Sequence, residues 1–114
     1  MSKKTVKAFK KNGRTFSSKT AMDEFEAIRE RLAEANESAV LCDGLEDALV
    51  GVAHRFGMEP VAAYDMAKII DIYVKRDGMT HEEAQEFFEF NVIGAGVDHC
   101  PVFVEIERDA FLIS

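Results

Sequence analysis

The stretch that decides the fold is Val61-Ala-Ala-Tyr-Asp-Met-Ala-Lys-Ile-Ile-Asp-Ile-Tyr-Val-Lys-Arg-Asp-Gly78. Its first four residues form a short apolar run, which predicts a buried strand over 61–64. Asp65 is then placed to cap a helix whose apolar residues recur with helical spacing from Met66 to Val74. Gly78 suits the left-handed position that often follows the last turn of a helix. A strand that leads directly into an amphipathic helix predicts helices packed on a sheet.

The residues before this stretch predict a second unit of the same kind. A short apolar run over 39–42 predicts another buried strand, and Asp43 with Glu46 has the spacing of a capping box. Apolar residues then keep helical spacing as far as Phe56, before Gly57, so we expect a helix over 45–56. Joined by this helix, the strands over 39–42 and 61–64 would form a right-handed βαβ unit and run parallel.

Two further elements are expected before position 39. Asn12-Gly13 is the dipeptide that most readily forms a type I′ turn, so we expect a hairpin in which Phe9 lies opposite Phe16 and Lys11 opposite Arg14. Thr20 is the expected cap of a helix with an acidic outer face, formed by Glu24, Glu26, Glu30, Glu34 and Glu37.

The C-terminal part of the chain predicts a helix and a strand. Thr80 and Glu83 form a capping box that opens a helix, which ends before Gly94-Ala-Gly96. Val102 to Ile106 alternate as in a strand with one face in the core. We therefore expect one small α+β domain with an N-terminal β-hairpin and four helices packed on a small mixed sheet. By charge, it divides into a basic hairpin arm over 1–19 and an acidic α+β domain over 20–114.

The charge is divided unevenly along the chain. The first 20 residues hold seven of the 14 Lys and Arg residues and no Asp or Glu, so the remainder has seven basic residues against all 21 acidic residues, a net charge of −14. With 47% apolar residues and no apolar run near the roughly 20 residues that span a bilayer, the 114-residue chain is typical of a globular domain, so we expect no membrane partner.

The start of the chain and its cysteines predict a location. No apolar stretch follows Lys3 and Lys4 as it does in a signal peptide. Cys42 and Cys100 lack the C-x-x-C spacing, so we expect neither a disulfide framework nor a Cys-rich zinc site. These features predict a cytoplasmic protein.

Polar side chains follow both predicted parallel strands. Because the carboxyl ends of parallel strands meet at one edge of a sheet, where ligands of such sheets bind, Asp43 and Asp47 would lie near Tyr64 and Asp65. Carboxylates brought together in this way can bind Mg²⁺ or Mn²⁺, or act as an acid/base pair. The interpretation that we favour is simpler, with no cofactor and with Asp43 and Asp65 serving as helix caps.

Other candidate residues carry weaker signals. Asn91 is a polar residue on an otherwise apolar helical stripe and needs a hydrogen-bond partner if it is buried. His99 and Cys100 are adjacent, and neighbours on an extended chain point apart, so they do not indicate a catalytic thiol. No stretch matches a strong catalytic motif, and an enzyme is therefore the less favoured class.

The basic hairpin has two interpretations. Its lysines and Arg14, interleaved with Phe9 and Phe16, could contact phosphates and stack on bases. The acidic remainder of the chain repels nucleic acid, however, and it offers the arm a surface of opposite charge. We therefore expect the arm to fold onto its own chain or onto a second copy, with no nucleic-acid partner.

A dense set of residues between Val40 and Val104 carries a family resemblance: Asp43-Gly-Leu-Glu-Asp-Ala48, Gly51, Pro60-Val-Ala-Ala-Tyr-Asp65, Arg76-Asp-Gly-Met-Thr80, Glu82-Glu-Ala84, Glu89-Phe-Asn91, Gly94-Ala95 and Pro101-Val-Phe103. Over a little more than half its length, the chain resembles a widespread family of small bacterial and phage proteins with no established reaction. The resemblance implies a phage or prophage setting, and it implies that Asp43, Asp47, Tyr64, Asp65 and Asn91 belong to the pattern that the family shares.

Together these observations predict an acidic, cytoplasmic protein of phage type that binds a host or phage protein, as an inhibitor or charge mimic. A metal-binding domain or metal-dependent enzyme that uses Asp43, Asp47 and Asp65 is the alternative, and nucleic-acid binding through the basic hairpin is the third. Phe90 and Ile72 lie off the apolar stripes of their helices, which indicates a surface for a homodimer or for a partner.

Overall fold

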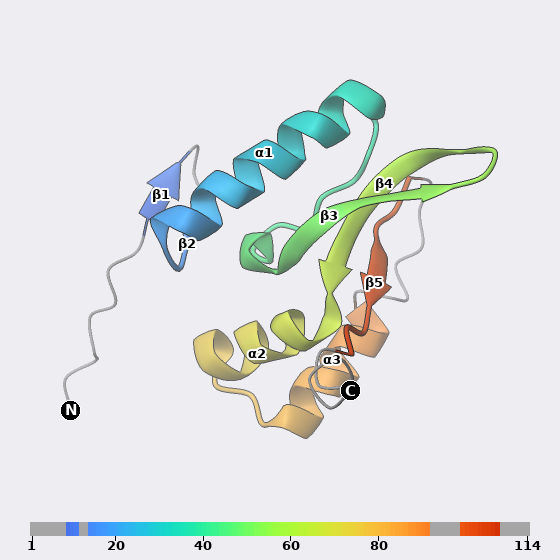
Figure 1. Ribbon diagram of the computed structural model, residues 1–114. Coiled ribbons are helices and arrows are strands. Elements are labelled where there is room, and N and C mark those ends of the chain that lie inside the picture. The colour runs from blue at the N-terminus through green and yellow to red at the C-terminus, as the bar shows by residue number, and fades with distance from the viewer. Residues whose placement is uncertain (1–8, 12–13, 92–98, 108–114) are drawn as a thin grey trace, which may run out of the picture.

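The computed structural model describes residues 9–11, 14–91 and 99–107 (Figure 1). Within these ranges the chain forms one α+β domain with three α-helices, a three-stranded mixed sheet and a two-stranded antiparallel sheet near its N-terminal end. The elements are β1 (Phe9–Lys11), β2 (Arg14–Phe16), α1 (Lys19–Ala35), the 3-10 helix η1 (Glu46–Ala48), β3 (Leu49–Arg55), β4 (Met58–Asp65), α2 (Met66–Asp77), α3 (His81–Asn91) and β5 (Val102–Val104).

Strand β4 is the centre of the sheet, in the order β3-β4-β5. It pairs antiparallel with β3, where Val52 lies opposite Ala62, and parallel with β5, where Tyr64 lies opposite Phe103. Helices α2 and α3 make the connection from β4 to β5, as parallel neighbours require a long crossover. The carboxyl ends of β4 and β5 therefore lie beside each other, next to the start of α2 (Figure 1).

The expected βαβ unit is wrong, and one of the four expected helices is absent from the described residues. The segment over 39–42 is not a strand, and most of the expected helix over 45–56 is strand β3, which pairs antiparallel with β4. Arg55 lies opposite Met58, so Phe56-Gly57 forms the turn, and Gly57 has a φ of 76°. A short apolar run fits a strand or a helix equally well, and here the pairing with β4 decides between them.

The predicted ends around α2 and at the start of α3 are confirmed, whereas the predicted caps at Thr20 and Asp43 and the helix end at Gly57 are wrong. The Asp65 carboxylate accepts from the amide of Ala67 at 2.9 Å at the start of α2, and Gly78 ends this helix with a φ of 73°. Thr80 and Glu83 form the reciprocal capping box at 2.9 and 3.1 Å. At α1 the prediction was wrong by two residues, because Ser18 and not Thr20 is the cap, with its hydroxyl accepting from the amide of Ala21 at 3.0 Å.

The N-terminal hairpin packs on the first helix. Phe9 in β1 lies opposite Phe16 in β2, while the turn expected at Asn12-Gly13 lies outside the described residues. Phe16 is 1% exposed and its ring lies 5.3 Å from that of Phe25 in α1. The guanidinium of Arg14 lies over the same ring at 5.1 Å. Strand β2 therefore contributes to the hydrophobic core of its own chain.

Phe103 lies on the face of β5 that meets the core. Phe103 packs on Tyr64 at 6.0 Å and on Phe88 at 5.1 Å between ring centroids. Val102 and Val104 are 38% and 39% exposed, and Ile106 lies beyond the strand. Phe103 is partly buried against the core, so its contacts with the two buried rings define the inner face of β5.

Replacing the buried cap of α2 tests this account of the fold. We expect Asp65→Ala to lower the free energy of unfolding by about 1–2 kcal/mol, because the first amides of α2 lose their acceptor. Asp43→Ala is the matched control, since Asp43 is exposed and caps no helix, and it is expected to change stability by less than about 0.5 kcal/mol. Urea unfolding of both variants measures the difference, and equal losses would contradict the capping role of Asp65.

Candidate functional site

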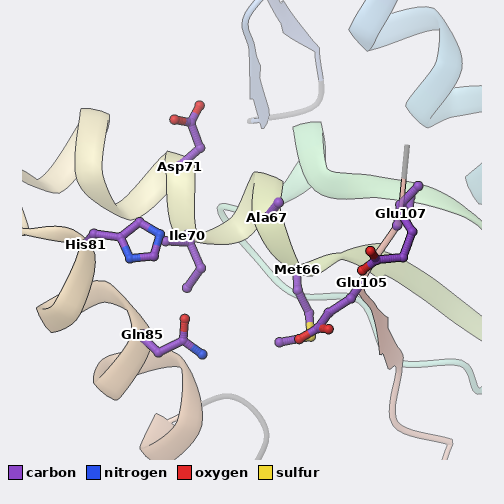
Figure 2. Close-up of a pocket in the computed structure, with 9 residues that line it drawn as sticks. Met66, Ala67, Ile70, Asp71, His81, Gln85, Glu105 and Glu107 are labelled. Atoms are coloured by element: carbon purple, nitrogen blue, oxygen red, sulfur yellow. The ribbon is translucent and has the colours of Figure 1, made fainter. Parts of the chain in front are cut away.

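A groove of about 400 Å³ lies at the carboxyl ends of β4 and β5. Helix α2, helix α3 and the residues after β5 enclose it, as Figure 2 shows. Its apolar lining is Met66, Ala67, Ile70 and Ile106, and its polar lining is Asp71, His81, Gln85, Glu105 and Glu107. The rule that ligands bind beyond the carboxyl ends of parallel strands thus points to this groove, although the two strands are not the expected pair.

The two helices reach the groove with residues of their first turns. Asp65 starts α2 directly after β4, so Met66 and Ile70, one turn apart, share the face that lines the groove. His81 and Gln85 have the same spacing in α3. Gly78 makes the reversal between the helices possible, and the amide of Met79 donates to the carbonyl of Tyr73 at 3.3 Å. Local capping thus sets the position of four lining residues.

The groove combines negative charge with an apolar surface. Asp71 pairs with Lys75 at 3.2 Å, whereas Glu105 and Glu107 form no ion pair within the described ranges. Both glutamates are exposed, and Ile70, which lines the other end of the groove beside His81, is 5% exposed (Figure 2). A site of this composition attracts a positive charge carried on an apolar group.

The five residues that the sequence singled out lie at separate points. Asp43 is exposed, and Asp47 accepts from the amide of Ser17 at 3.1 Å. Asp65 caps α2, as described above. Tyr64 is fully buried, and Asn91 is exposed, with its side-chain amide donating to the carbonyl of Phe87 at 3.1 Å. The parallel strands that were to bring the first four together do not form, so their role in binding stays a prediction.

Metal-binding residues do not gather in this part of the chain. Among the residues that the structure describes, no group of three or more His, Cys, Asp or Glu side chains is arranged to hold a metal ion. Asp47 and Asp65 have partners in the backbone, which explains both side chains without an ion.

Tyr64 ties an irregular segment to the core. Its hydroxyl accepts from the amide of Cys42 at 2.8 Å. Burial raises the pKa of the Tyr64 hydroxyl well above its ordinary value, and burial also raises the pKa of the Cys42 thiol. Both groups are therefore neutral at physiological pH, and neither is an activated nucleophile.

Arg76 and Glu46 hold the loop before η1. The guanidinium of Arg76 donates to the carbonyl of Gly44 at 2.7 Å, and the carboxylate of Glu46 accepts from the amide of Gly44 at 3.0 Å. Gly44 has a φ of 85°, and a Cβ there would lie 3.2 Å from Arg76 Nη1. Arg76 also binds the carboxylate of Asp77, whose pKa this hydrogen bond lowers. These residues have structural roles.

A second polar cluster lies away from the groove. The side-chain amide of Asn36, which is 4% exposed, donates to the carbonyl of Pro60 at 2.8 Å. The same nitrogen lies 3.2 Å from His99 Nδ1, and Glu59 Oε1 lies 3.8 Å from that ring nitrogen. The carbonyl of His99 accepts from the amide of Val40 at 3.1 Å. This cluster joins the segment before β5 to the end of α1.

Sequence reasoning missed the lining of the groove. The sequence patterns did not single out His81, Gln85, Glu105 or Glu107 as a site. The signal was present in part, because the i, i+4 spacing in two successive capped helices predicts two faces near one strand end. What was missing was the parallel pairing of β4 with β5, which brings Glu105 and Glu107 to the same place.

Removing the Tyr64 hydroxyl tests its structural role. We expect Tyr64→Phe to lower the free energy of unfolding by about 1–2 kcal/mol, because the half-buried amide of Cys42 loses its acceptor. Tyr73→Phe is the matched control, since the Tyr73 hydroxyl makes no hydrogen bond within the described ranges, and a change below about 0.5 kcal/mol is expected. Chemical denaturation measures both, and equal effects would refute the role.

The two thiols should differ in reactivity. The thiolate is the reactive form, and the raised pKa keeps the half-buried Cys42 protonated at a pH where an ordinary thiol begins to ionise. We expect iodoacetamide at pH 8 to modify the exposed Cys100 several-fold faster than Cys42, with a smaller difference near pH 10. Peptide mass spectrometry of timed samples measures both rates, and unfolded protein in urea is the control with similar rates. Faster modification of Cys42 in the folded protein would contradict this account.

Known proteins were compared with this chain by sequence and by structure. No family model, no curated protein and no solved structure gave a match to this sequence. The resemblance to small bacterial and phage proteins therefore stays a prediction. No helix among the described residues has both the length and the apolar character to cross a membrane.

Proposed function

We propose that this protein is an interaction module whose groove at the ends of β4 and β5 binds a basic and apolar segment of a partner protein. The single observation that carries the proposal is the joint presence of Glu105 and Glu107 with Met66, Ile70 and Ile106 in one groove. Carboxylates attract the lysines or arginines of a partner, and the apolar side chains bury a neighbouring apolar residue.

The size of the groove supports a segment of a protein as ligand. About 400 Å³ lies near the lower end of the roughly 300–1,000 Å³ that ligand pockets span, which suits one or two side chains. Two capped helices, α2 and α3, bound the groove and are ordered before binding, while its third wall is the segment 105–107 that follows β5 without regular structure.

The charge of the chain supports a basic partner. Helix α1, which packs on β3 and β4 away from the groove, exposes Glu24, Glu30 and Glu34 and adds a second negative surface. A strongly acidic chain attracts basic proteins over distances near the Debye length, about 8 Å at physiological salt. The resemblance to small phage proteins makes a host or phage protein the natural partner, with inhibition or charge mimicry as the consequence of binding.

The N-terminal hairpin gives less support to the nucleic-acid alternative. Stacking on bases needs exposed aromatic rings, and Phe16 is 1% exposed because it packs on Phe25. Arg14 lies over the ring of Phe25 and is engaged in the same contact.

Selection from a library of displayed random peptides tests the proposed function. We expect immobilised protein to enrich peptides that place Lys or Arg next to Phe, Met or Leu. Binding of a synthetic selected peptide should weaken at least tenfold between 0.05 and 0.5 M salt, because exposed charges are screened. It should also weaken at least tenfold in the double variant Glu105→Lys, Glu107→Lys.

A charge reversal elsewhere provides the control. Glu24 and Glu30 are exposed on α1 and do not line the groove, so the double variant Glu24→Lys, Glu30→Lys has the same net charge as the groove variant. We expect it to keep most of the affinity. Enrichment of acidic peptides, or equal losses in the two double variants, would overturn the proposed function.

A further inference from the structure

The turn between β3 and β4 carries two exposed apolar side chains. Phe56 is 102% exposed relative to an isolated residue, and Met58 is 55% exposed. Two further exposed residues precede them, His54 and Arg55, and the guanidinium of Arg55 lies 3.4 Å from the sulfur of Met58. We call residues 54–58 the hairpin tip. A fully exposed aromatic side chain at the end of a paired hairpin contributes nothing to the core, which marks it as a candidate contact residue.

The hairpin tip has the chemistry that the groove accepts. It presents one guanidinium, from Arg55, beside the apolar side chains of Phe56 and Met58. The groove presents Glu105 and Glu107 beside its apolar lining. The hairpin tip thus combines a positive charge with apolar side chains, and the groove combines negative charges with apolar side chains.

One molecule cannot join its own two surfaces. The hairpin tip lies at the start of β4, and the groove lies at its end, so the eight residues of β4 hold them roughly 25 Å apart. Figure 1 shows the turn between β3 and β4 pointing away from α2 and α3. The contact therefore requires a second copy of the chain.

We propose that the hairpin tip of one copy inserts Phe56 into the groove of a second copy, with Arg55 facing Glu105 and Glu107. This inference rests on the proposed function, because it assigns an occupant to the same groove. The contact joins two different surfaces, so it is head-to-tail, and the proposed arrangement is the open one, in which each added copy leaves one free tip and one free groove; a rotation that closed a ring would stop assembly at a fixed size. Assembly therefore continues beyond the dimer as the concentration rises.

The affinity of this contact is expected to be low. An aromatic side chain buries about 150–250 Å², and the tip adds Met58 and part of Arg55, which is well below the roughly 1,200–2,000 Å² of stable interfaces. The tip is already ordered by its pairing with β4, which reduces the cost of binding. Association in the range of tens to hundreds of micromolar, weakened by salt, is the expected behaviour.

Sedimentation velocity of the full chain from about 10 µM to 1 mM tests the proposal. We expect the weight-average mass to rise from 12.8 kDa to more than twice that value in low salt. Phe56→Asp, which places a carboxylate at the tip, and the double variant Glu105→Lys, Glu107→Lys should each remain monomeric. The matched control, Glu24→Lys with Glu30→Lys on α1, lies outside both surfaces and should associate like the unaltered chain.

A mixture of the two monomeric variants gives the decisive result. The tip variant keeps its groove, and the groove variant keeps its tip, so an equimolar mixture should form a dimer and nothing larger. A mixture that stays monomeric overturns the proposal. It is overturned equally if the unaltered chain is monomeric at 1 mM, or if Phe56→Asp associates as the unaltered chain does.

Failure of this inference can be separated from failure of the proposed function. Phe56→Asp retains the groove, so it should bind a selected basic and apolar peptide whether or not the chain self-associates. Peptide binding by this variant, together with a monomeric unaltered chain, refutes self-association and leaves the proposed function standing. Loss of peptide binding in Phe56→Asp would contradict both, because the groove of this variant is unchanged.

Discussion

The buried carboxylate of Asp65 is the constraint on which the rest of the structure depends. Asp65 is 3% exposed and satisfies the first amides of α2. A buried carboxylate is tolerated only with such partners, so β4 must end and α2 must begin at this residue. The direction of α2 then places α3 beside it, and α3 leads the chain back to β5. The groove exists because these three elements meet at the end of β4.

Features that depend on nearby residues could be predicted from the sequence. The caps at Asp65, Gly78 and Thr80 are each decided within three or four positions, and all three were predicted correctly. The segment over 45–56 was predicted wrongly because its apolar residues fit a helix and a strand alike. Pairing with β4 decides in favour of the strand. This pairing depends on residues outside the segment, so the pattern within 45–56 cannot reveal it. The inward position of Phe103 depends in the same way on Tyr64 and Phe88.

The candidate site also depends on contacts between residues far apart in the sequence, which the sequence patterns did not predict. The general rule for parallel strands identified the right kind of place, but it was applied to strands that do not form. Asp43, Asp47, Tyr64 and Asp65 were chosen for their position after or within those strands, and three of them hold backbone amides. Glu105 and Glu107 could not be predicted as groove residues, because their position depends on the pairing of β5 with β4. Residues that support the fold are thus easier to read from this sequence than residues that line its groove.

The bond from the amide of Cys42 to the Tyr64 hydroxyl has a consequence for the motions of the chain. Cys42 lies in a segment without regular structure, where amide hydrogens normally exchange with water through small local openings. Its acceptor, however, belongs to a side chain that is completely buried. Hydrogen exchange at the Cys42 amide therefore requires this segment to detach from the core. The exchange rate of this one loop amide thus measures how often the hydrophobic centre of the domain opens.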